Sequence, residues 1–323
     1  MINSVRNTVL SILNKNNYGY ISPSDFNLFA KQAQLDIFDD YIYQYNYQIQ
    51  KENARQSGSG YADLKKGYEE VIEMFSVTNY LPTTNPVLNQ VDLGNQYYLP
   101  ALLYTSDDYY LINKVLAYET TVTSGVSTSV FFNNLDDSAA NFIADGVQVG
   151  DIVFNLRTLT PIFATVTQVL SGNILVLSAD IFTVTSSAYV IFKPKQNELE
   201  KVTLSKITML NNSMLTAPST TFPVYTLNEA GIITTYPNSI KGYGAVNATY
   251  FRYPLDPKWT YITLASGEPL FDQTQLDYQD FELPLEEEYK LAQKILQYCG
   301  MTIRETEVVQ YAIGQEAGRD ANT

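Results

Sequence analysis

The chain has 323 residues, of which 45% are hydrophobic and 17% are charged, as in a folded protein that buries a substantial core. It contains no histidine and one cysteine, Cys299, so a Ser-His-Asp triad, a Cys-His pair, a His-ligated zinc site and an internal disulfide are excluded. A formal net charge of −14 disfavours binding to nucleic acid and to an anionic membrane surface, because each needs a basic face.

No apolar run approaches the ~18 residues of a membrane-spanning helix. The N-terminal sequence MINSVRNTVLSILNKNN lacks the small-residue cleavage site of a secretory signal peptide. A single cysteine is typical of proteins assembled in a reducing compartment. We therefore expect a protein without a membrane partner that is assembled in a reducing cytoplasm.

A long helix is predicted over about residues 21–54, and we expect the rest of the chain to be organised around it. Ser22 is placed as its N-cap and Pro23 occupies the first helical position. Ile21 and Phe26 stand where a hydrophobic staple needs its two partners. Apolar residues then recur in steps of three and four, the spacing of one helix face: Phe26, Phe29, Ala33, Ile37, Tyr41 and Tyr45.

Four of the 26 tyrosines, Tyr41, Tyr43, Tyr45 and Tyr47, alternate along the second half of this helix. Side chains two positions apart point in different directions on a helix, so the four cannot all face the intramolecular core. Tyrosine is enriched at protein interfaces because it combines a large apolar area with a polar tip. We predict that these four residues take part in an interaction. The alternative is that some are partly exposed tyrosines without a partner.

Two shorter helices are predicted on either side of the long one. They cover residues 4–14 and 61–75, and the second follows a turn at residues 58–60. Residues 77–106 are rich in Pro, Asn and Thr, which predicts an extended connector with one strand around residues 97–99.

Residues 115–195 have a strand pattern throughout, with about five or six short β-branched and aromatic runs separated by turn residues. Because the composition changes at both ends, we expect an inserted small β-barrel or sandwich that folds on its own. Residues 200–265 predict a further antiparallel sheet with Pro at strand ends, from the segments KVTLSKITML, TFPVYTL, AGIITTYP and AVNATYFRYPLDPKWTYITL.

The end of the chain is predicted to be helical again. Pro284 opens a helix whose first turn carries residues 286–288, all Glu, near the positive end of the helix dipole. Gly300 is expected to end this helix, and Cys299 is expected to be a buried small hydrophobe. A last helix is predicted over residues 304–316.

These elements predict an α+β fold: a terminal helical bundle packed with a central antiparallel sheet, plus an inserted small β-barrel or sandwich domain. The expected core domain combines residues 1–114 and 196–323. Residues 115–195 form the expected insertion.

Carboxylates are the only side chains left for acid–base catalysis. The densest clusters are Asp107 with Asp108, Asp136 with Asp137, and Glu282 with Glu286, Glu287 and Glu288. A glycosidase needs two carboxylates that face each other about 5–10 Å apart, and adjacency in the sequence does not show this. We therefore predict no catalytic residue.

Two further motifs have simple structural interpretations. Asn133, Asn134, Asp136 and Asp137 offer oxygen ligands for calcium, but their spacing is not that of an EF-hand, so a solvated turn is the preferred interpretation. The segment at 241–244, Lys-Gly-Tyr-Gly, lacks the frame of a phosphate loop and predicts a turn between strands. No metal and no cofactor is predicted.

Three stretches resemble virion structural proteins of the crAss-like tailed bacteriophages. They are the opening VRNTVLSILNKNNYGYISPSDFNLFAKQAQLDIFDDYIYQYN, the segment YFRYPLDPKW at 250–259, and FELPLEEEYKLAQKILQYCGMTIRETEVVQYAIGQEA at 281–317. Within the expected insertion, GVQVGDIVFN and ATVTQVLSGNILVLSADIF resemble small β domains of phage tail and neck proteins.

This resemblance implies a head-to-tail connector or tail-ring subunit with about twelve copies in a closed ring that matches the portal. Helices of such a subunit dock beneath the portal, and β domains decorate or extend the ring. The resemblance brings no catalytic residues with it.

We therefore expect a non-enzymatic structural subunit in the neck or tail of a virion, through which phage DNA passes without specific binding. Its expected partners are further copies of itself, the portal and the neighbouring tail and ring proteins. One alternative is a carbohydrate-binding or host-recognition tail module, since Tyr- and Asn-rich β regions bind sugars. A less favoured alternative is a glycosidase-type depolymerase.

Overall fold

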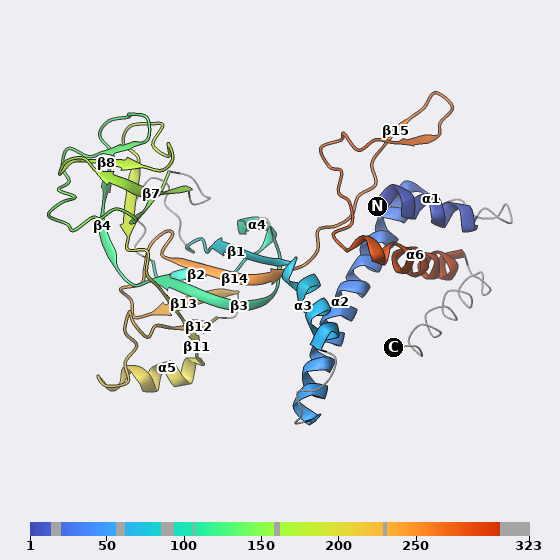
Figure 1. Ribbon diagram of the computed structural model, residues 1–323, viewed down its shortest axis with the longest axis horizontal. Helices are drawn as coiled ribbons and strands as arrows, with labels where there is room; N and C mark the ends of the chain where they lie inside the picture. Colours follow the sequence, from blue (N-terminus) through green and yellow to red (C-terminus); the bar gives the residue numbers. More distant parts are fainter. Residues whose placement is uncertain are drawn as a thin grey trace. The chain divides into compact units, whose positions relative to one another are not determined.

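The computed structural model describes residues 1–13, 21–55, 62–84, 94–105, 107–157, 162–228 and 231–303. The packing divides the chain into two compact units, Met1–Phe75 with Tyr253–Thr323 (unit 1) and Ser76–Arg252 (unit 2). Helices predominate over strands in unit 1, and strands predominate over helices in unit 2 (Figure 1), so the fold is α+β, as predicted.

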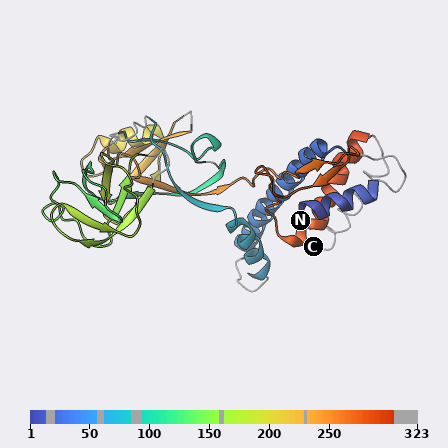
Figure 2. The same cartoon turned by 90° about the horizontal axis from the view of Figure 1, so that it is seen from above.

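The described part of unit 1 contains four helices of three turns or more. They are α1 (Ile2–Leu13), α2 (Pro23–Arg55), α3 (Ala62–Glu73) and α6 (Glu288–Ile303), the last preceded by a 3₁₀ turn at Leu285–Glu287. Helix α2 packs against α3 and α6, and α1 packs against α6. Figure 2 shows α1 and α2 in blue gathered with α6 in red. The three N-terminal helices lie where the sequence predicts them.

The start of α2 follows the predicted capping pattern. The Ser22 hydroxyl accepts a hydrogen bond from the Asp25 backbone N–H at 3.1 Å and donates one to the Asp25 carboxylate at 2.7 Å. Ile21 and Phe26 are both buried, as the two partners of a hydrophobic staple are. Local sequence is therefore sufficient to begin this helix.

A two-stranded antiparallel hairpin also belongs to unit 1. Strand β15 (Tyr261–Thr263) pairs with β16 (Pro269–Phe271), and Ile262 lies opposite Leu270. The sequence pattern assigned the first strand of this hairpin to the large antiparallel sheet. That assignment is wrong, because the only partner of β15 among the described strands is β16.

Two four-stranded sheets lie in the described part of unit 2. The first has the order β1 (Ser76–Tyr80), β14 (Val246–Arg252), β3 (Tyr109–Tyr118) and β10 (Gln196–Glu198), with every neighbouring pair antiparallel. The second has the order β11 (Glu200–Lys201), β12 (Val224–Leu227), β13 (Ile232–Tyr236) and β2 (Gln96–Tyr98). The strand predicted near residues 97–99 is β2.

A six-stranded antiparallel sheet corresponds to the predicted β insertion. Its order is β4 (Thr121–Val126), β9 (Ala188–Phe192), β6 (Ile152–Asn155), β7 (Ile162–Val169), β8 (Ile174–Leu177) and β5 (Asn134–Asp136). One isolated bridge, from Ser129 to Asp136, links the chain just after β4 to the opposite edge strand. Among the strands that the structure describes, no continuous ladder closes this sheet into a barrel.

Side chains of the six-stranded sheet belong to two hydrophobic cores. One of these cores is shared with the neighbouring sheets, so the sheet and its neighbours form one compact unit and the boundaries of that unit do not fall at residues 115 and 195. The core of the sheet itself contains Leu135, Phe142 and Ile191, among others. Phe154 and Phe192 belong instead to a core that they share with strands of the neighbouring sheets, including β3 and β14. The expected boundary at residue 115 also falls inside β3.

Two predicted segments have a different structure. The run KVTLSKITML, predicted as strand, forms α5 (Leu204–Asn211), because the Thr203 side chain caps a helix there by accepting the Lys206 backbone N–H. A short helix, α4 (Leu102–Thr105), and strand β1 lie in the segment expected to be a connector.

Helix α6 continues through Gly300 to Ile303, so the prediction that Gly300 ends it is wrong. A helical glycine costs only about 1 kcal/mol relative to Ala, and Gly300 is buried. The last predicted helix, residues 304–316, and the turn at 58–60 lie outside the described residues.

Candidate interaction surfaces

The four tyrosines of α2 divide into an inward and an outward pair. Tyr41 and Tyr45 are half-buried, whereas Tyr43 and Tyr47 are exposed, with 66% of Tyr43 accessible. Members of each pair are four residues apart and therefore lie on one helix face. The inference that some of these tyrosines point away from the core is confirmed. Their role in an interaction stays a prediction.

Tyr41 is committed to contacts within its own unit. Its hydroxyl donates a 2.7 Å hydrogen bond to the Glu287 carboxylate, which lies in the 3₁₀ turn before α6. Its ring meets that of Tyr68 edge to face, with 5.9 Å between centroids, and Lys290 Nζ lies 5.8 Å from the Tyr41 centroid. Tyr41 therefore joins α2 to α3 and α6.

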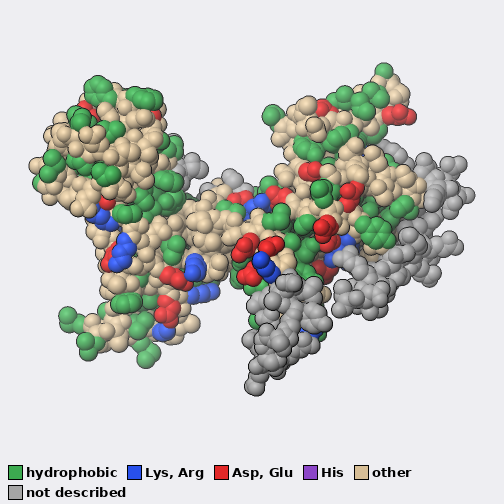
Figure 3. Space-filling model, in the orientation of Figure 1, with side chains coloured by type: hydrophobic (Ala, Val, Ile, Leu, Met, Phe, Trp, Pro, Cys, Tyr) green, Lys and Arg blue, Asp and Glu red, His purple; other side chains and the backbone are tan. Residues whose placement is uncertain are grey.

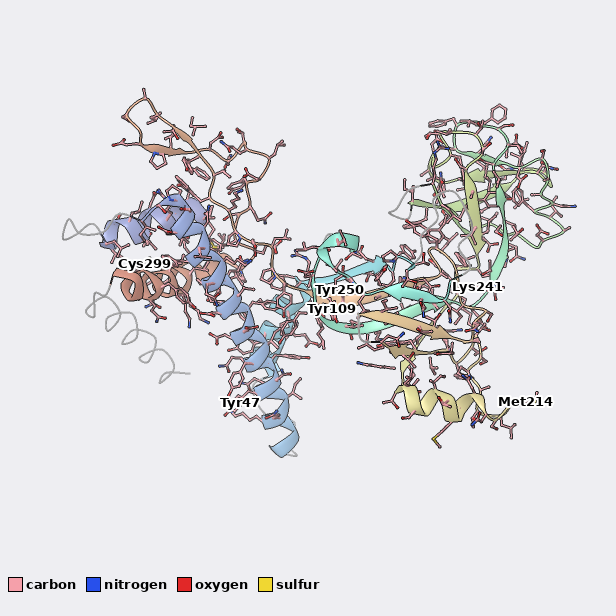
Figure 4. The ribbon with its side chains drawn as sticks, turned by 180° about the vertical axis from the view of Figure 1, so that it is seen from behind. Tyr47, Tyr109, Met214, Lys241, Tyr250 and Cys299 are labelled. Carbon is pink, nitrogen blue, oxygen red and sulfur yellow. The ribbon has the colours of Figure 1, made fainter. Side chains whose placement is uncertain are left out.

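Tyr43 and Tyr47 present their rings to solvent on the other side of the helix. Lys51 Nζ lies 5.8 Å from the Tyr47 ring centroid, one turn further along. Figure 4 shows Tyr47 in the second half of α2. Of the four predicted interaction residues, these two have the exposure that binding to another molecule requires.

A second exposed surface lies in unit 2, in the segment that follows α5. Met214 and Leu215 are 99% and 97% exposed, and Phe222 is also exposed. Hydrogen bonds hold the segment in place, from the Ala217 N–H to the Ser213 carbonyl at 2.9 Å and from Asn197 Nδ2 to the Thr220 carbonyl at 2.7 Å. Figure 4 labels Met214 at the tip of this segment. The apolar side chains are thus presented by a hydrogen-bonded backbone.

The turn before β5 carries a third group of exposed apolar side chains. Phe131 and Phe132 project from it, next to Asn133, whose backbone has a φ of +58°. Asparagine tolerates this left-handed conformation better than most residues. Exposed Val126 and Val130 precede the two phenylalanines in the chain.

The hairpin β15–β16 of unit 1 carries a fourth group. Ile262, Leu264 and Leu270 are each about half exposed. Leu276, which follows the hairpin in the chain, is fully exposed. Figure 3 shows apolar side chains, in green, over this part of unit 1.

The first carboxylate cluster serves local structure. The Asp108 carboxylate accepts the Leu102 backbone N–H at 2.9 Å, at the start of α4. The Asp107 carboxylate lies 3.9 Å from Arg252 Nε and accepts the Tyr250 hydroxyl at 3.5 Å. Burial raises the pKa of Tyr250, which keeps this hydroxyl a donor.

The second cluster contains a buried carboxylate, so the predicted solvated turn is wrong for Asp137. This side chain accepts the Tyr189 hydroxyl at 2.7 Å and the Ala139 backbone N–H at 2.9 Å. Burial, followed by the hydrogen bond to Asp137, raises the pKa of Tyr189. Gly125 lies directly against the pair, since a Cβ there would be 2.6 Å from both polar groups.

The third cluster joins separate segments of unit 1. Glu282 accepts the Leu255 backbone N–H at 2.7 Å, and the buried Glu287 accepts the Tyr41 hydroxyl. Across the described part of the chain, no group of three or more His, Cys, Asp or Glu side chains is arranged to hold a metal ion. Of the carboxylates that the sequence singled out, five therefore accept hydrogen bonds within the fold: Asp107, Asp108, Asp137, Glu282 and Glu287.

Two other sequence predictions agree with the structure. Cys299 is buried in α6, and burial raises the pKa of its thiol to about 12, so it stays protonated and apolar. The segment at 241–244 forms a turn between β13 and β14, in which Gly242 and Gly244 have φ values of +93° and +76°. None of the helices that the structure describes is long and apolar enough to cross a membrane.

A scan against protein-family models finds no match for this sequence, and a search of curated proteins finds none either.

The exposed apolar groups on the hairpin and after α5 were not singled out by the sequence analysis. The hairpin has a recognisable pattern, since YITLASGEPLF places two short apolar runs on either side of a Ser-Gly turn. Met214 and Leu215 have no comparable pattern. Their exposure follows only from the position of the segment on the folded chain.

Proposed function

We propose that this protein is a non-enzymatic structural subunit of a tailed-phage virion, which assembles into a homo-oligomeric ring in the head-to-tail connector or the tail. The observation that carries the proposal is the exposure of large apolar side chains on ordered, projecting segments of both units. Met214 and Leu215 in unit 2 and the hairpin in unit 1 are the main examples.

A free subunit exposes these apolar side chains to water, and assembly with another molecule would cover them. Large exposed apolar patches mark interaction sites, and the centres of protein interfaces are enriched in aromatic residues and Met. A ring that closes by head-to-tail contacts needs two different surfaces on every subunit. Exposed groups on several separate elements meet this requirement.

The resemblance to virion proteins of the crAss-like phages supplies the setting. It favours about twelve copies around a symmetry axis. Further copies, the portal and neighbouring ring or tail proteins are the proposed partners, and the virion neck or tail is the proposed location. Phage DNA would pass through the ring without specific contacts.

The uses of the carboxylate clusters support a structural role over the depolymerase alternative. Asp107, Asp108, Asp137, Glu282 and Glu287 all accept hydrogen bonds from groups of the same chain. No observation on the described residues favours the sugar-binding alternative.

Mass photometry and native mass spectrometry over a range of protein concentrations, with and without portal protein, test the proposal. We expect one discrete ring species that grows with concentration or forms when portal protein is added. A chain that stays monomeric under all of these conditions would contradict the proposed ring.

A further inference from the structure

Two of the five methionines of the chain lie close together on the surface of unit 2. Met209 is in the last turn of α5 and is 74% exposed. Met214, labelled in Figure 4, follows α5 and is 99% exposed. Methionine is usually buried in folded proteins, so two thioethers with this much access to water, only five positions apart, are unusual. The stretch from Met209 to Leu215 is here called the methionine segment.

The backbone of the methionine segment is held by hydrogen bonds between nitrogen and oxygen atoms. The Asn212 N–H bonds the Met209 carbonyl at 3.3 Å. The Thr216 hydroxyl donates to the Leu210 carbonyl at 3.1 Å. These bonds hold the segment in place and leave the thioether groups of both methionines in water.

A different side chain packs α5 onto unit 2. Ile207 is 3% exposed and shares a core with Val202 and with Val224 of β12. Met209 is two positions further along the helix, so its side chain points in another direction. A polar group added to the sulfur of Met209 or Met214 therefore leaves this core intact.

A thioether in water reacts with hydrogen peroxide without first losing a proton. The sulfur lone pair attacks one peroxide oxygen, the O–O bond breaks, and the products are methionine sulfoxide and water. The sulfur thus gives up an electron pair, which the peroxide takes up. Because the sulfoxide is polar, this reaction turns an apolar surface side chain into a hydrogen-bond acceptor.

The single cysteine does not compete for the oxidant. Reaction at Cys299 requires the thiolate, and burial raises the pKa of this thiol to about 12. At neutral pH only about one molecule in 10⁵ therefore carries a thiolate at this position. Among the side chains that the structure describes, Met214 and Met209 are the sulfur groups most open to an oxidant.

We propose that Met209 and Met214 form a peroxide-reactive site, at which reversible oxidation makes the surface of the methionine segment polar while the fold is retained. Methionine sulfoxide reductases, one for each epimer of the sulfoxide, restore the thioether. The site gives the chain a surface whose apolar character responds to oxidant. This inference stands apart from the proposed ring, because it requires only that the free subunit meets peroxide.

The direct test is a time course of the full-length chain in hydrogen peroxide, followed by peptide mass spectrometry. We expect Met214 and Met209 to gain one oxygen atom each, more than about 10-fold faster than Cys299. They should also react before Met74, which is 58% exposed. Oxidation of Cys299 or Met74 ahead of the methionine segment would overturn the proposal.

The double variant Met209→Leu/Met214→Leu isolates the effect of the site on the surface. Leucine keeps the size and helix preference of methionine but has no sulfur to oxidise. At a peroxide exposure that modifies Met214, the wild type should elute earlier from a hydrophobic-interaction column, and the double variant should not shift. Met74→Leu is the matched control and should shift as the wild type does.

Reversal and stability complete the test. Treatment with both sulfoxide reductases should return the wild type to its original elution, and its urea midpoint should be the same before and after oxidation. An equal shift in the double variant, a shift that the reductases do not reverse, or a lower midpoint than that of the oxidised double variant would each overturn the proposal.

Discussion

Two carboxylates that belong to the acidic clusters of the sequence, Asp137 and Glu287, connect distant parts of the fold through tyrosine hydroxyls. Asp137 and Tyr189 are 52 positions apart, and Tyr41 and Glu287 are 246 apart. A buried carboxylate without donors would cost several kcal/mol, so each needs a partner when it is buried. At the scale of residues, these pairs give Asp137 and Glu287 a structural use within the fold.

Gly125→Ala tests the packing around the buried pair of Asp137 and Tyr189. The added Cβ would lie 2.6 Å from both polar groups, so either the pair or the strand must move. We expect a loss of roughly 1–3 kcal/mol in the free energy of unfolding, measured by urea denaturation with circular dichroism in the strand region. Gly67→Ala in α3 is the control, since nothing lies within 4 Å of its Cβ. It should stabilise by about 0.5–1 kcal/mol, and equal effects at both positions would contradict this account.

Tyr41→Phe and Tyr43→Phe separate the inward from the outward tyrosines of α2. Each variant removes one hydroxyl, but only that of Tyr41 donates to a buried carboxylate. We expect Tyr41→Phe to lower the stability of unit 1 by about 1–2 kcal/mol and Tyr43→Phe to change it by less than about 0.5. Urea unfolding followed by Trp259 fluorescence reports on this unit. A larger loss for Tyr43→Phe would show that the helix face is assigned wrongly.

At the scale of elements, the segment that forms the six-stranded sheet begins and ends at residues that lie side by side. The Glu119 backbone N–H bonds the Lys195 carbonyl at 3.1 Å, and Tyr118 pairs with Gln196 between β3 and β10. The entry and exit are therefore adjacent, as an insertion requires. However, Phe154 and Phe192 share a core with β3 and β14, so we expect the insertion to stabilise the strands around it.

Replacing residues 120–194 by a short Gly/Ser linker tests this dependence. We expect the helical circular dichroism to remain, because the long helices α1, α2, α3 and α6 belong to unit 1. The rest of unit 2 should lose protection, since Val115 and Val246 lose the aromatic side chains packed in the same core. Hydrogen exchange at β14 measures the loss. Full protection of β14 in the shortened chain would favour the self-contained domain predicted from composition.

At the scale of the whole molecule, the charge distribution is acidic in both units. Unit 1 contains 22 of the 34 acidic residues and 12 of the 20 basic ones, which leaves acid in excess in unit 2 as well. Among the described residues, eight lysines are paired with carboxylates: Lys31, Lys66, Lys114, Lys193, Lys195, Lys206, Lys258 and Lys290. The acidic excess of both units disfavours the neutralisation of phosphates.

We therefore expect no measurable binding of duplex DNA at physiological ionic strength. Non-specific binders reach dissociation constants of ~10⁻⁴–10⁻⁶ M through many lysine and arginine contacts, each of which is salt-dependent. Fluorescence anisotropy of a labelled duplex, titrated with the assembled protein and repeated at low salt, measures this. Micromolar binding that weakens steeply with salt would reveal a basic surface stripe on a protein whose net charge is negative. It would contradict the proposal that DNA slides through the ring without being bound.

Local sequence was enough to predict most elements of this protein. The cap at Ser22, Pro23 and the staple of Ile21 with Phe26 locate the start of α2, because these contacts involve neighbours in the chain. The strand content of residues 115–195 and the α+β class follow from side-chain periodicity. Spacing along the helix also showed that the four tyrosines must divide between faces.

The tertiary structure decided what depends on contacts between distant residues. Periodicity could not tell that Tyr41 faces inward, because this depends on Glu287 and Tyr68 in other elements. It could not give β15 its partner or show that Trp259 anchors the hairpin through Asn3 and Asn27. The pattern of KVTLSKITML fits strand and helix alike, and the core that Ile207 of α5 shares with Val224 of β12 depends on a strand further along the chain. Sequence patterns indicate which face of an element is apolar. The element that packs against that face is determined only by the tertiary fold.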